Sequence, residues 1–156
     1  MHGCSRIKQV FHLVEELGLK ELLPAYLDPN LKPSDLPTGV CFASGASGYD
    51  PLTPKVVSVI SMSAQLEMFK EYLGRLKAVV GEKKKNYIIA NTLFIVVAGS
   101  DDLANTYFTI RTPQLHYDVP AYTDLMVSKA SEFVKEHEEL EYSVQHQLGT
   151  YHHKGL

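Results

Sequence analysis

The sequence predicts an α/β fold, because extended and helical hydrophobic patterns alternate along its 156 residues. Two short apolar runs, at residues 39–44 and 93–98, are typical of buried strands. Each run precedes a stretch in which apolar residues recur every three or four positions, as in an amphipathic helix. Two strands are too few for an independent sheet, so we expect the chain to be the middle of a larger α/β structure.

Four helices are predicted around these strands. Residues 6–23 form the first, and a connector containing Pro24, Pro29, Pro33 and Pro37 follows it, since proline disfavours helix at and before its position. Residues 63–80 and about 83–90 form the second and third. The apolar face of the second helix comprises Leu66, Phe69, Leu73, Leu76 and Val80.

The fourth helix is expected over residues 118–140. Asp118 is suited to the N-cap, and proline is tolerated in the first turn, where Pro120 lies. The buried face of this helix is predicted to comprise Tyr122, Leu125, Met126 and Phe133.

Composition excludes several classes of protein. A net charge of −3 and a pI near 6.1 argue against a nucleic-acid partner. Residues 83–85, three lysines beside Glu82, are expected to be a solvated helix end. Cys4 and Cys41 are too few for a disulfide framework or a metal site, and Cys41 is expected to be a small buried hydrophobic residue. No run reaches the roughly 18 apolar residues of a membrane span.

Two loops at the ends of the predicted strands are candidates for a functional site. Residues 44–48 read SGASG and residues 99–102 read GSDD. The carboxyl ends of parallel strands lie at one edge of a sheet, so both loops are expected to face one pocket. Three interpretations remain open from the residues alone: a phosphate-binding loop that lacks the P-loop lysine, a metal held by Asp101 and Asp102 without a third ligand, or two tight turns with Asp102 capping the residues that follow.

The same loops resemble a known family. GVCFASGASGYDPLTP and VVAGSDDLANTYF resemble the second and third conserved blocks of the plant GDSL esterase/lipases, which are SGNH-type hydrolases. The resemblance covers residues 14–136, including DVPAYTDLM, and is nearest to the extracellular-lipase-like subgroup, a secreted group. It implies a three-layer, flavodoxin-like α/β fold that is incomplete here, because the first strand and the C-terminal strands are missing.

The resemblance also implies serine chemistry on carboxylic esters of lipid or acyl substrates, with no cofactor and no metal. Gly45 takes the position of the oxyanion-hole glycine and Asp101 that of the oxyanion-hole asparagine; Asp102 and Gly99 match supporting positions of the third block. An ionised carboxylate at position 101 cannot donate a hydrogen bond to an oxyanion. We therefore expect backbone donors, including that of Gly45, to stabilise the oxyanion.

The catalytic residues themselves are not identified in this sequence. Residues 1–13 match no family block and contain no G-D-S nucleophile motif. Residues 137–156 do not resemble the fourth block, but a back-translation of residues 136–154, read with one added base, yields GARRIGVFSAAPIGYVPSQ, which does. We therefore predict a frame-shifted tail at 137–156, in which His137, His146, His152 and His153 carry no selected chemistry. Asp124 and His116 are expected at the surface.

These observations predict an ester hydrolase by family and an inactive product in this chain, because covalent ester hydrolysis has no first step without a nucleophile. The alternative is a non-catalytic binding or decoy module that pairs with full-length relatives. Self-association through exposed strand edges is expected, along with a marginally stable assembly. The family is secreted, but the N-terminal residues lack the apolar core of a signal peptide, so we expect the chain as written to stay in the cytoplasm.

Overall fold

A computed structural model describes residues 23–111 and 113–152, and most of these residues are helical. The elements are η1 (Pro33–Thr38), α2 (Thr53–Val56), α3 (Met62–Val80), α4 (Glu82–Ala90), η2 (Asp102–Ile110), η3 (Pro113–Leu115) and α5 (Val119–His152). The predicted helix at 6–23 lies outside the described residues apart from Leu23, which is not helical.

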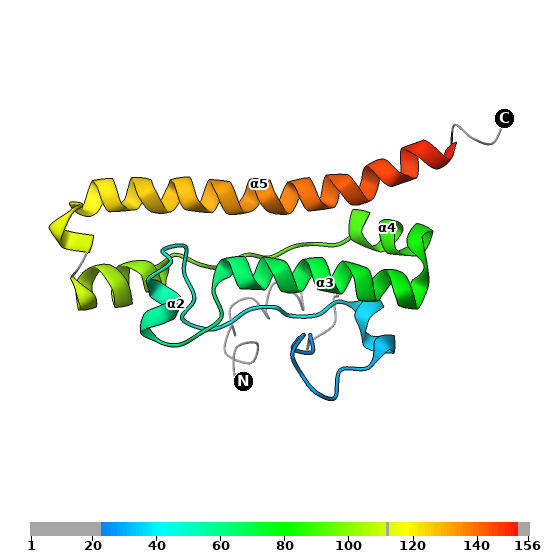
Figure 1. Cartoon of the computed structure of the whole chain (residues 1–156), viewed down its shortest axis with the longest axis horizontal. Helices are drawn as coiled ribbons and strands as arrows, with labels where there is room; N and C mark the ends of the chain where they lie inside the picture. The colour runs from blue at the N-terminus through cyan, green and yellow to red at the C-terminus, as the bar shows by residue number, and fades with distance from the viewer. Residues whose placement is uncertain (1–22, 112, 153–156) are drawn as a thin grey trace.

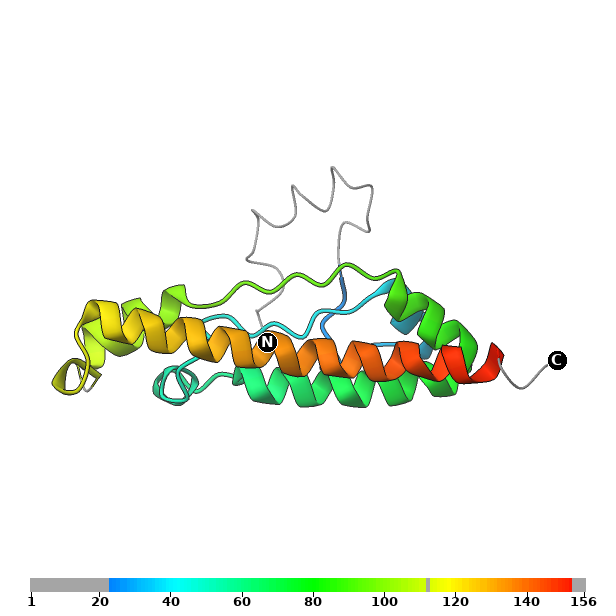
Figure 2. The ribbon, with the colours of Figure 1, turned by 90° about the horizontal axis from the view of Figure 1, so that it is seen from above.

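The described residues form two layers. Helices α3 and α5 run in the same direction and make up one layer. The extended segments at residues 39–44 and 92–98 make up the other layer and run opposite to the helices (Figures 1 and 2). The predicted order of extended segment, helix, extended segment and helix is therefore present.

The two predicted strands, at residues 39–44 and 93–98, are extended but belong to no sheet within the described residues. One isolated parallel bridge joins Ala25 to Cys41, through hydrogen bonds of 2.9 Å from Tyr26 N–H to the Cys41 carbonyl and from Cys41 N–H to the Pro24 carbonyl. Residues 93–98 form no ladder there. A strand needs a neighbouring strand to bond with, and no described segment supplies one to residues 93–98. The three-layer arrangement expected from the family resemblance is likewise not seen in this part of the chain.

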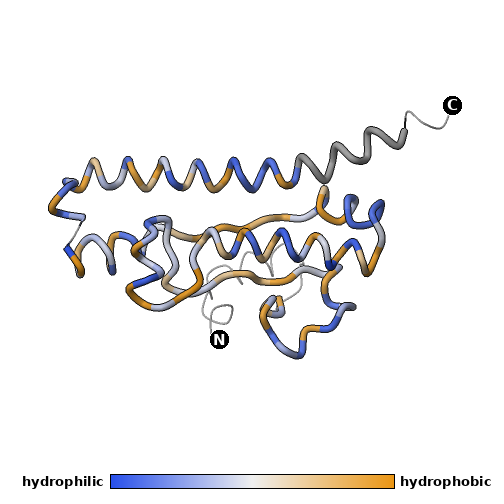
Figure 3. Tube along the Cα trace, viewed as in Figure 1, coloured by the Kyte–Doolittle hydropathy of each residue, from blue (hydrophilic) through white to orange (hydrophobic). Residues whose placement is uncertain are grey.

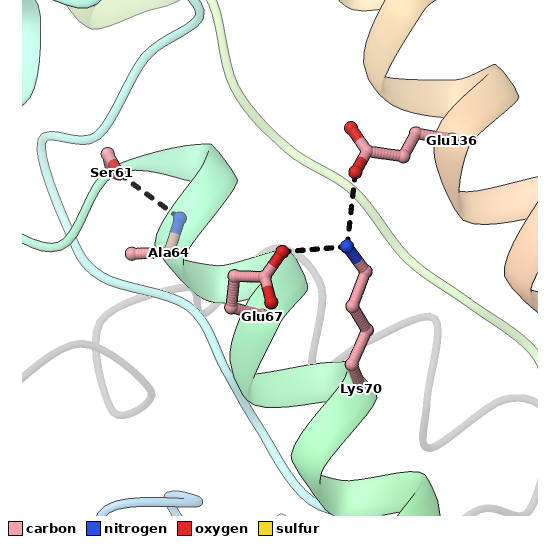
Figure 4. Close-up of polar contacts among 5 residues, drawn as sticks. All are labelled: Ser61, Ala64, Glu67, Lys70 and Glu136. Atoms are coloured by element: carbon pink, nitrogen blue, oxygen red, sulfur yellow. Dashed lines mark hydrogen bonds and ion pairs between the residues drawn. The ribbon is translucent and has the colours of Figure 1, made fainter.

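Helix α3 begins at Met62, one residue before the predicted start, and Ser61 is its N-cap. The Ser61 hydroxyl accepts a hydrogen bond of 3.2 Å from Ala64 N–H, which satisfies one of the unpaired donors at the helix start (Figure 4). The helix ends at Val80, and its C-cap Gly81 has a φ of +80°, which favours glycine. The predicted apolar face is confirmed: Leu66, Phe69 and Leu76 are buried, and Leu73 and Val80 are partly buried.

Aromatic side chains fill the space between the two layers. The ring centroid of Phe42, in the first extended segment, lies 5.9 Å from that of Phe69 and 5.6 Å from that of Tyr72, both on α3. Phe94 of the second segment lies 5.4 Å from Phe69, again edge to face. Such pairs contribute about 0.5–1.5 kcal/mol beyond their buried area. The core therefore joins each extended segment to the same helix.

The N-cap of α5 is confirmed, because Asp118 Oδ1 accepts a hydrogen bond of 2.9 Å from Ala121 N–H. On its predicted inner face Tyr122 and Met126 are buried, and Leu125 and Phe133 are packed against the cores. The helix, however, continues beyond the predicted end at residue 140 to His152.

The first turn of the predicted tail packs against the core. His137 stacks on Phe69 with ring centroids 4.8 Å apart, meets Phe94 edge to face at 4.5 Å, and places Nδ1 2.9 Å from Glu141 Oε1. One residue earlier, Glu136 accepts a hydrogen bond of 3.3 Å from Lys70 of α3, which also bonds Glu67 (Figure 4). Residues 136–141 thus belong structurally to the helical layer.

Two local predictions are wrong. Lys85, expected in a solvated lysine run, is buried and donates a hydrogen bond of 2.5 Å to Glu82 Oε1. Lys77 also pairs with Glu82, and these two lysines lower the pKa of its carboxyl group. Cys41 is disulfide-bonded and only partly buried, so it is not a buried free thiol. Within the described residues, none of the helices combines the length and apolarity that crossing a bilayer requires.

Replacement of Leu76 by alanine tests the core. Leu76 is fully buried, so Leu76→Ala is expected to lower the free energy of unfolding by about 2–5 kcal/mol. Val79→Ala on the same helix is the matched control, because Val79 is exposed and the change is expected to cost under about 0.5 kcal/mol. Urea unfolding followed by circular dichroism measures both, and equal losses would contradict the assignment of this core face.

Alkaline pH tests the packing of Tyr72. Burial raises the pKa of Tyr72 from 10.0 to about 12, and its hydroxyl donates a hydrogen bond of 3.0 Å to the Leu36 carbonyl. In the unfolded chain this tyrosine ionises first, so its stabilising effect is complete below pH 10 and is lost as the pH rises toward 12.

Tyr72→Phe is expected to remove about 1 kcal/mol at pH 8 through the lost hydrogen bond, and to weaken the fall in stability between pH 10 and 12. Tyr87→Phe, at an exposed position, is the control and should leave the curve unchanged. The free energy of unfolding is measured across this pH range for Tyr72→Phe and for the unmodified chain. Parallel curves for the two would refute the assignment.

Candidate functional site

The two glycine-rich loops meet at the carboxylate of Asp102, the first residue of η2. Asp102 Oδ2 accepts a hydrogen bond of 2.8 Å from Tyr49 N–H, and Oδ1 accepts bonds of 3.0 Å from Asp50 N–H and 2.5 Å from the Thr53 hydroxyl. Asp102 and Thr53 are both fully buried. The carboxylate of Asp102 therefore holds the two loop regions together; the expectation that both loops face one pocket stays a prediction.

Gly48 is required for this contact. A Cβ atom at residue 48 would overlap Asp102 Oδ1 and lie 2.5 Å from its Cγ, which is closer than real atoms approach. The absence of a side chain at this position lets the carboxylate reach the backbone donors of residues 49 and 50. The glycine of the second block is thus explained by close approach.

A second set of hydrogen bonds extends the contact to α5. The Thr53 and Thr106 hydroxyl oxygens lie 2.6 Å apart, which ties α2 to η2. The Tyr122 hydroxyl donates a bond of 2.8 Å to Asp50 Oδ2, and Asp50 Oδ1 accepts one of 2.8 Å from Leu52 N–H. Three segments far apart in sequence therefore converge on two buried carboxylates.

Neutral groups supply all of these hydrogen bonds to Asp50 and Asp102. Burial, together with its hydrogen bond to Asp50 and the charges of Asp50 and Asp102, raises the pKa of Tyr122. Burial and the charge of Asp102 also raise the pKa of Tyr49. The Tyr122 hydroxyl therefore keeps its proton and remains a hydrogen-bond donor at neutral pH.

The predicted oxyanion positions lie next to this network. Gly45 is exposed in the first loop, with open space where a Cβ atom would lie, and its neighbour Ala46 has a left-handed φ of +65°. Asp101 is partly buried, and its Oδ1 accepts a hydrogen bond of 2.9 Å from Asn105 Nδ2. Gly99, two residues before Asp101, has a φ of +110°, which favours glycine. No hydrogen bond in the described residues joins Gly45 directly to Asp101.

The contacts of the two loops bear on each of the three interpretations. The backbone N–H groups of Tyr49 and Asp50, which a phosphate-binding loop would direct at its ligand, are taken by Asp102. The described residues include no group of three acidic, histidine or cysteine side chains that could hold a metal ion. The third interpretation holds in part. Ser47 N–H donates a hydrogen bond of 3.2 Å to the Ser44 carbonyl, which closes a tight turn in the first loop. Asp102, however, does not cap η2, since its carboxylate bonds the other loop.

Sequence reasoning missed most of the network. Asp50, Thr53, Thr106 and Tyr122 contribute to it, and Asn105 supports Asp101. Asp50 and Tyr122 are 72 positions apart, and Thr53 and Thr106 are 53 apart, so no local spacing links them. The π-helical geometry of η2, which is rare and often found at functional sites, also gave no sequence signal.

Comparison with known proteins shows what the sequence of this chain is similar to. GDSL esterase/lipase EXL3 of Arabidopsis thaliana is 62% identical over 122 residues, which are 78% of this chain and 33% of that protein. Two further GDSL esterase/lipases of the same plant are 53% identical over 121 residues and 51% identical over 122 residues, each covering 78% of this chain and 30% or 32% of the relative. No protein-family model and no solved structure matches the chain.

The chain belongs to the plant GDSL esterase/lipase family, as the resemblance of its two glycine-rich blocks predicted. It spans about a third of the length of the curated relatives it matches.

Replacement of single glycines tests the contact at Asp102. Gly48→Ala forces Asp102 or the loop to move, because the new Cβ would overlap Oδ1. We expect a loss of about 2–4 kcal/mol in the free energy of unfolding, as buried hydrogen bonds to a charged group are broken. Gly45→Ala is the matched control in the same loop, because nothing lies within 4 Å of its Cβ position. Chemical denaturation measures both; similar losses would show that close approach does not explain Gly48.

Proposed function

We propose that this chain supplies the oxyanion-binding part of an enzyme that hydrolyses carboxylic esters of acyl or lipid substrates. One observation carries the proposal: the Asp102 carboxylate bonds Tyr49 and Asp50, and so holds the loop that contains Gly45 beside the segment that contains Asp101. The names of the similar Arabidopsis proteins, all GDSL esterase/lipases, support the reaction class.

Gly45 is proposed as a backbone donor to the oxyanion. It is exposed, and in the described residues no acceptor bonds its N–H, so this group is free to donate to a substrate. The loop is anchored on both sides: the Ser44 hydroxyl accepts a bond of 3.2 Å from Ile60 N–H, and residues 49 and 50 bond Asp102. A donor held in place before the reaction stabilises the developing charge without reorganisation.

Asn105 is proposed as the side-chain donor that position 101 lacks. Its Nδ2 carries two hydrogens, and one of them bonds Asp101 Oδ1 at 2.9 Å. That bond orients the amide and leaves the second hydrogen for an oxyanion. Asp101 would then be a positioning residue rather than a donor, which removes the difficulty of an acid in the asparagine position.

The 156 residues contain no G-D-S sequence, so we propose that this chain alone does not cleave esters. We further propose that residues 14–136 are the family segment and that 137–156 arise from a shifted reading frame. The continuation of α5 to His152 is compatible with that origin, since a helix requires only residues of adequate propensity.

A chimera tests the proposed roles. The matching 122 residues of EXL3 are replaced by those of this chain, and hydrolysis of p-nitrophenyl butyrate is measured. The chimera is expected to retain activity. Asn105→Asp in the chimera is expected to lower kcat by about 10²–10³-fold, the usual cost of losing an oxyanion donor, while Asp101→Asn changes it little.

The isolated 156-residue chain is the control and should neither hydrolyse the ester nor react with a fluorophosphonate probe. Melting temperatures of both chimeric variants separate lost chemistry from lost folding. Full activity in a folded Asn105→Asp chimera would refute the donor role, and labelling of the isolated chain at a serine would refute the proposed inactivity.

A further inference from the structure

Tyr122, in the first turn of α5, contacts both halves of the proposed oxyanion site. Its hydroxyl donates a hydrogen bond of 2.8 Å to Asp50 Oδ2, five residues after Gly45. Its ring packs against that of Tyr107 on η2, with centroids 4.8 Å apart. The Tyr122 side chain is fully buried, so water does not compete for either contact. One side chain therefore joins the first glycine-rich loop to the helix that carries Asn105.

The start of α5 lies beside the segments that it joins. Helix α2, η2 and the first turns of α5 lie at the same end of the described residues, away from α4 (Figures 1 and 2). Figure 3 shows hydrophilic and hydrophobic residues interspersed at this end. A small apolar core and a polar network share this region, and Tyr122 belongs to both, through its ring and its hydroxyl.

Asp50 transmits the position of the Tyr122 hydroxyl to the loop. Asp50 Oδ1 accepts a bond of 2.8 Å from Leu52 N–H, and within the described residues Tyr122 donates the only hydrogen bond to Oδ2. The backbone N–H of Asp50 donates a bond of 3.0 Å to Asp102 Oδ1. The side chain of Asp50 is therefore held by α5, while its backbone is held by η2.

The position of Tyr122 is itself fixed by the capped first turn of α5. Its N–H donates a bond of 2.9 Å to the Asp118 carbonyl, and Asp118 Oδ1 accepts one of 2.9 Å from Ala121 N–H. A side chain on a capped helix is held more precisely than one on a loop. Helix α5 thus provides a rigid reference point for the loop.

We infer that Tyr122 is a positioning residue. Through Asp50 it fixes the loop of Gly45 with respect to η2, and so sets the spacing between the two proposed oxyanion donors, Gly45 and Asn105. The inference rests on the proposed function, because it assigns what holds those donors in place. Tyr122 acts through Asp50 and does not touch the substrate. A displacement of about 1 Å costs a reaction up to about 10²-fold in rate, so this hydrogen bond is expected to affect catalysis.

Hydrogen exchange in the full 156-residue chain tests the tie without using activity. Tyr122→Phe keeps the buried ring and removes only the hydroxyl. The exchange rates of the Tyr49 and Asp50 N–H groups, which bond Asp102, are then expected to rise at least about tenfold, the factor that a hydrogen bond to a charged group is worth.

Tyr107→Phe is the matched control for this exchange experiment. It removes a hydroxyl bond of 3.1 Å to the Tyr117 carbonyl in the same core, but that bond reaches neither buried carboxylate. Unchanged exchange in the Tyr122→Phe chain, or the same rise in both variants, would overturn the inference.

The EXL3 chimera tests the catalytic consequence. With p-nitrophenyl butyrate, Tyr122→Phe is expected to lower kcat by about tenfold to a hundredfold and to leave KM nearly unchanged, because misplaced donors weaken binding of the transition state alone. Tyr107→Phe is expected to leave both constants near those of the parent chimera, and melting temperatures establish that both variants fold. An unchanged kcat in a folded Tyr122→Phe chimera, or an equal fall for Tyr107→Phe, would refute the positioning role.

A double-mutant cycle in the chimera tests whether Tyr122 acts through Asp50. The variant with both Tyr122→Phe and Asp50→Asn is expected to be no slower than the slower single variant. Effects on kcat that multiply would show that the two residues act independently, and would overturn the inference. A parent chimera without activity would refute the proposed function and the catalytic role together; the exchange rates identify that case, because they respond to the tie alone.

Discussion

The carboxylate of Asp102 is the constraint on which the site depends. It is fully buried and is kept there by two backbone N–H groups and the Thr53 hydroxyl. A buried charge needs such donors, because the cost of removing it from water exceeds the gain from any single hydrogen bond. Gly48 leaves room for it, and the position of the loop at 44–50 follows from that approach.

Two separate hydrophobic cores stabilise the described residues. The larger one packs Phe42 and Phe94 of the extended layer against Phe69 of α3. The smaller one, around Tyr107, Tyr122 and Met126, lies at the site and shares Tyr122 with its hydrogen-bond network. Changes in the smaller core therefore affect both stability and the geometry of the loops. The larger core has no residue in the hydrogen-bond network; it holds together the extended segments and α3.

Helices and caps followed from local patterns, whereas the pairing of the extended segments did not. The face of α3 and the Asp118 cap depend on residues within one or two turns, so spacing alone predicts them. A strand depends on a neighbour distant in sequence, and residues 93–98 have none among the described residues. The burial of Lys85 and the packing of His137 on Phe69 likewise depend on what lies opposite.

The amino-acid sequence by itself determined the family, the two glycine-rich loops and the helices that follow them, because these are properties of consecutive residues. Only the tertiary structure decided what Asp102 does. An aspartate at position 102 could either cap the helix that follows it or bond the other loop. Which of the two it does depends on which N–H and O–H donors come within hydrogen-bonding distance. Those donors, on Tyr49, Asp50 and Thr53, are about fifty positions away and are brought near by folding alone.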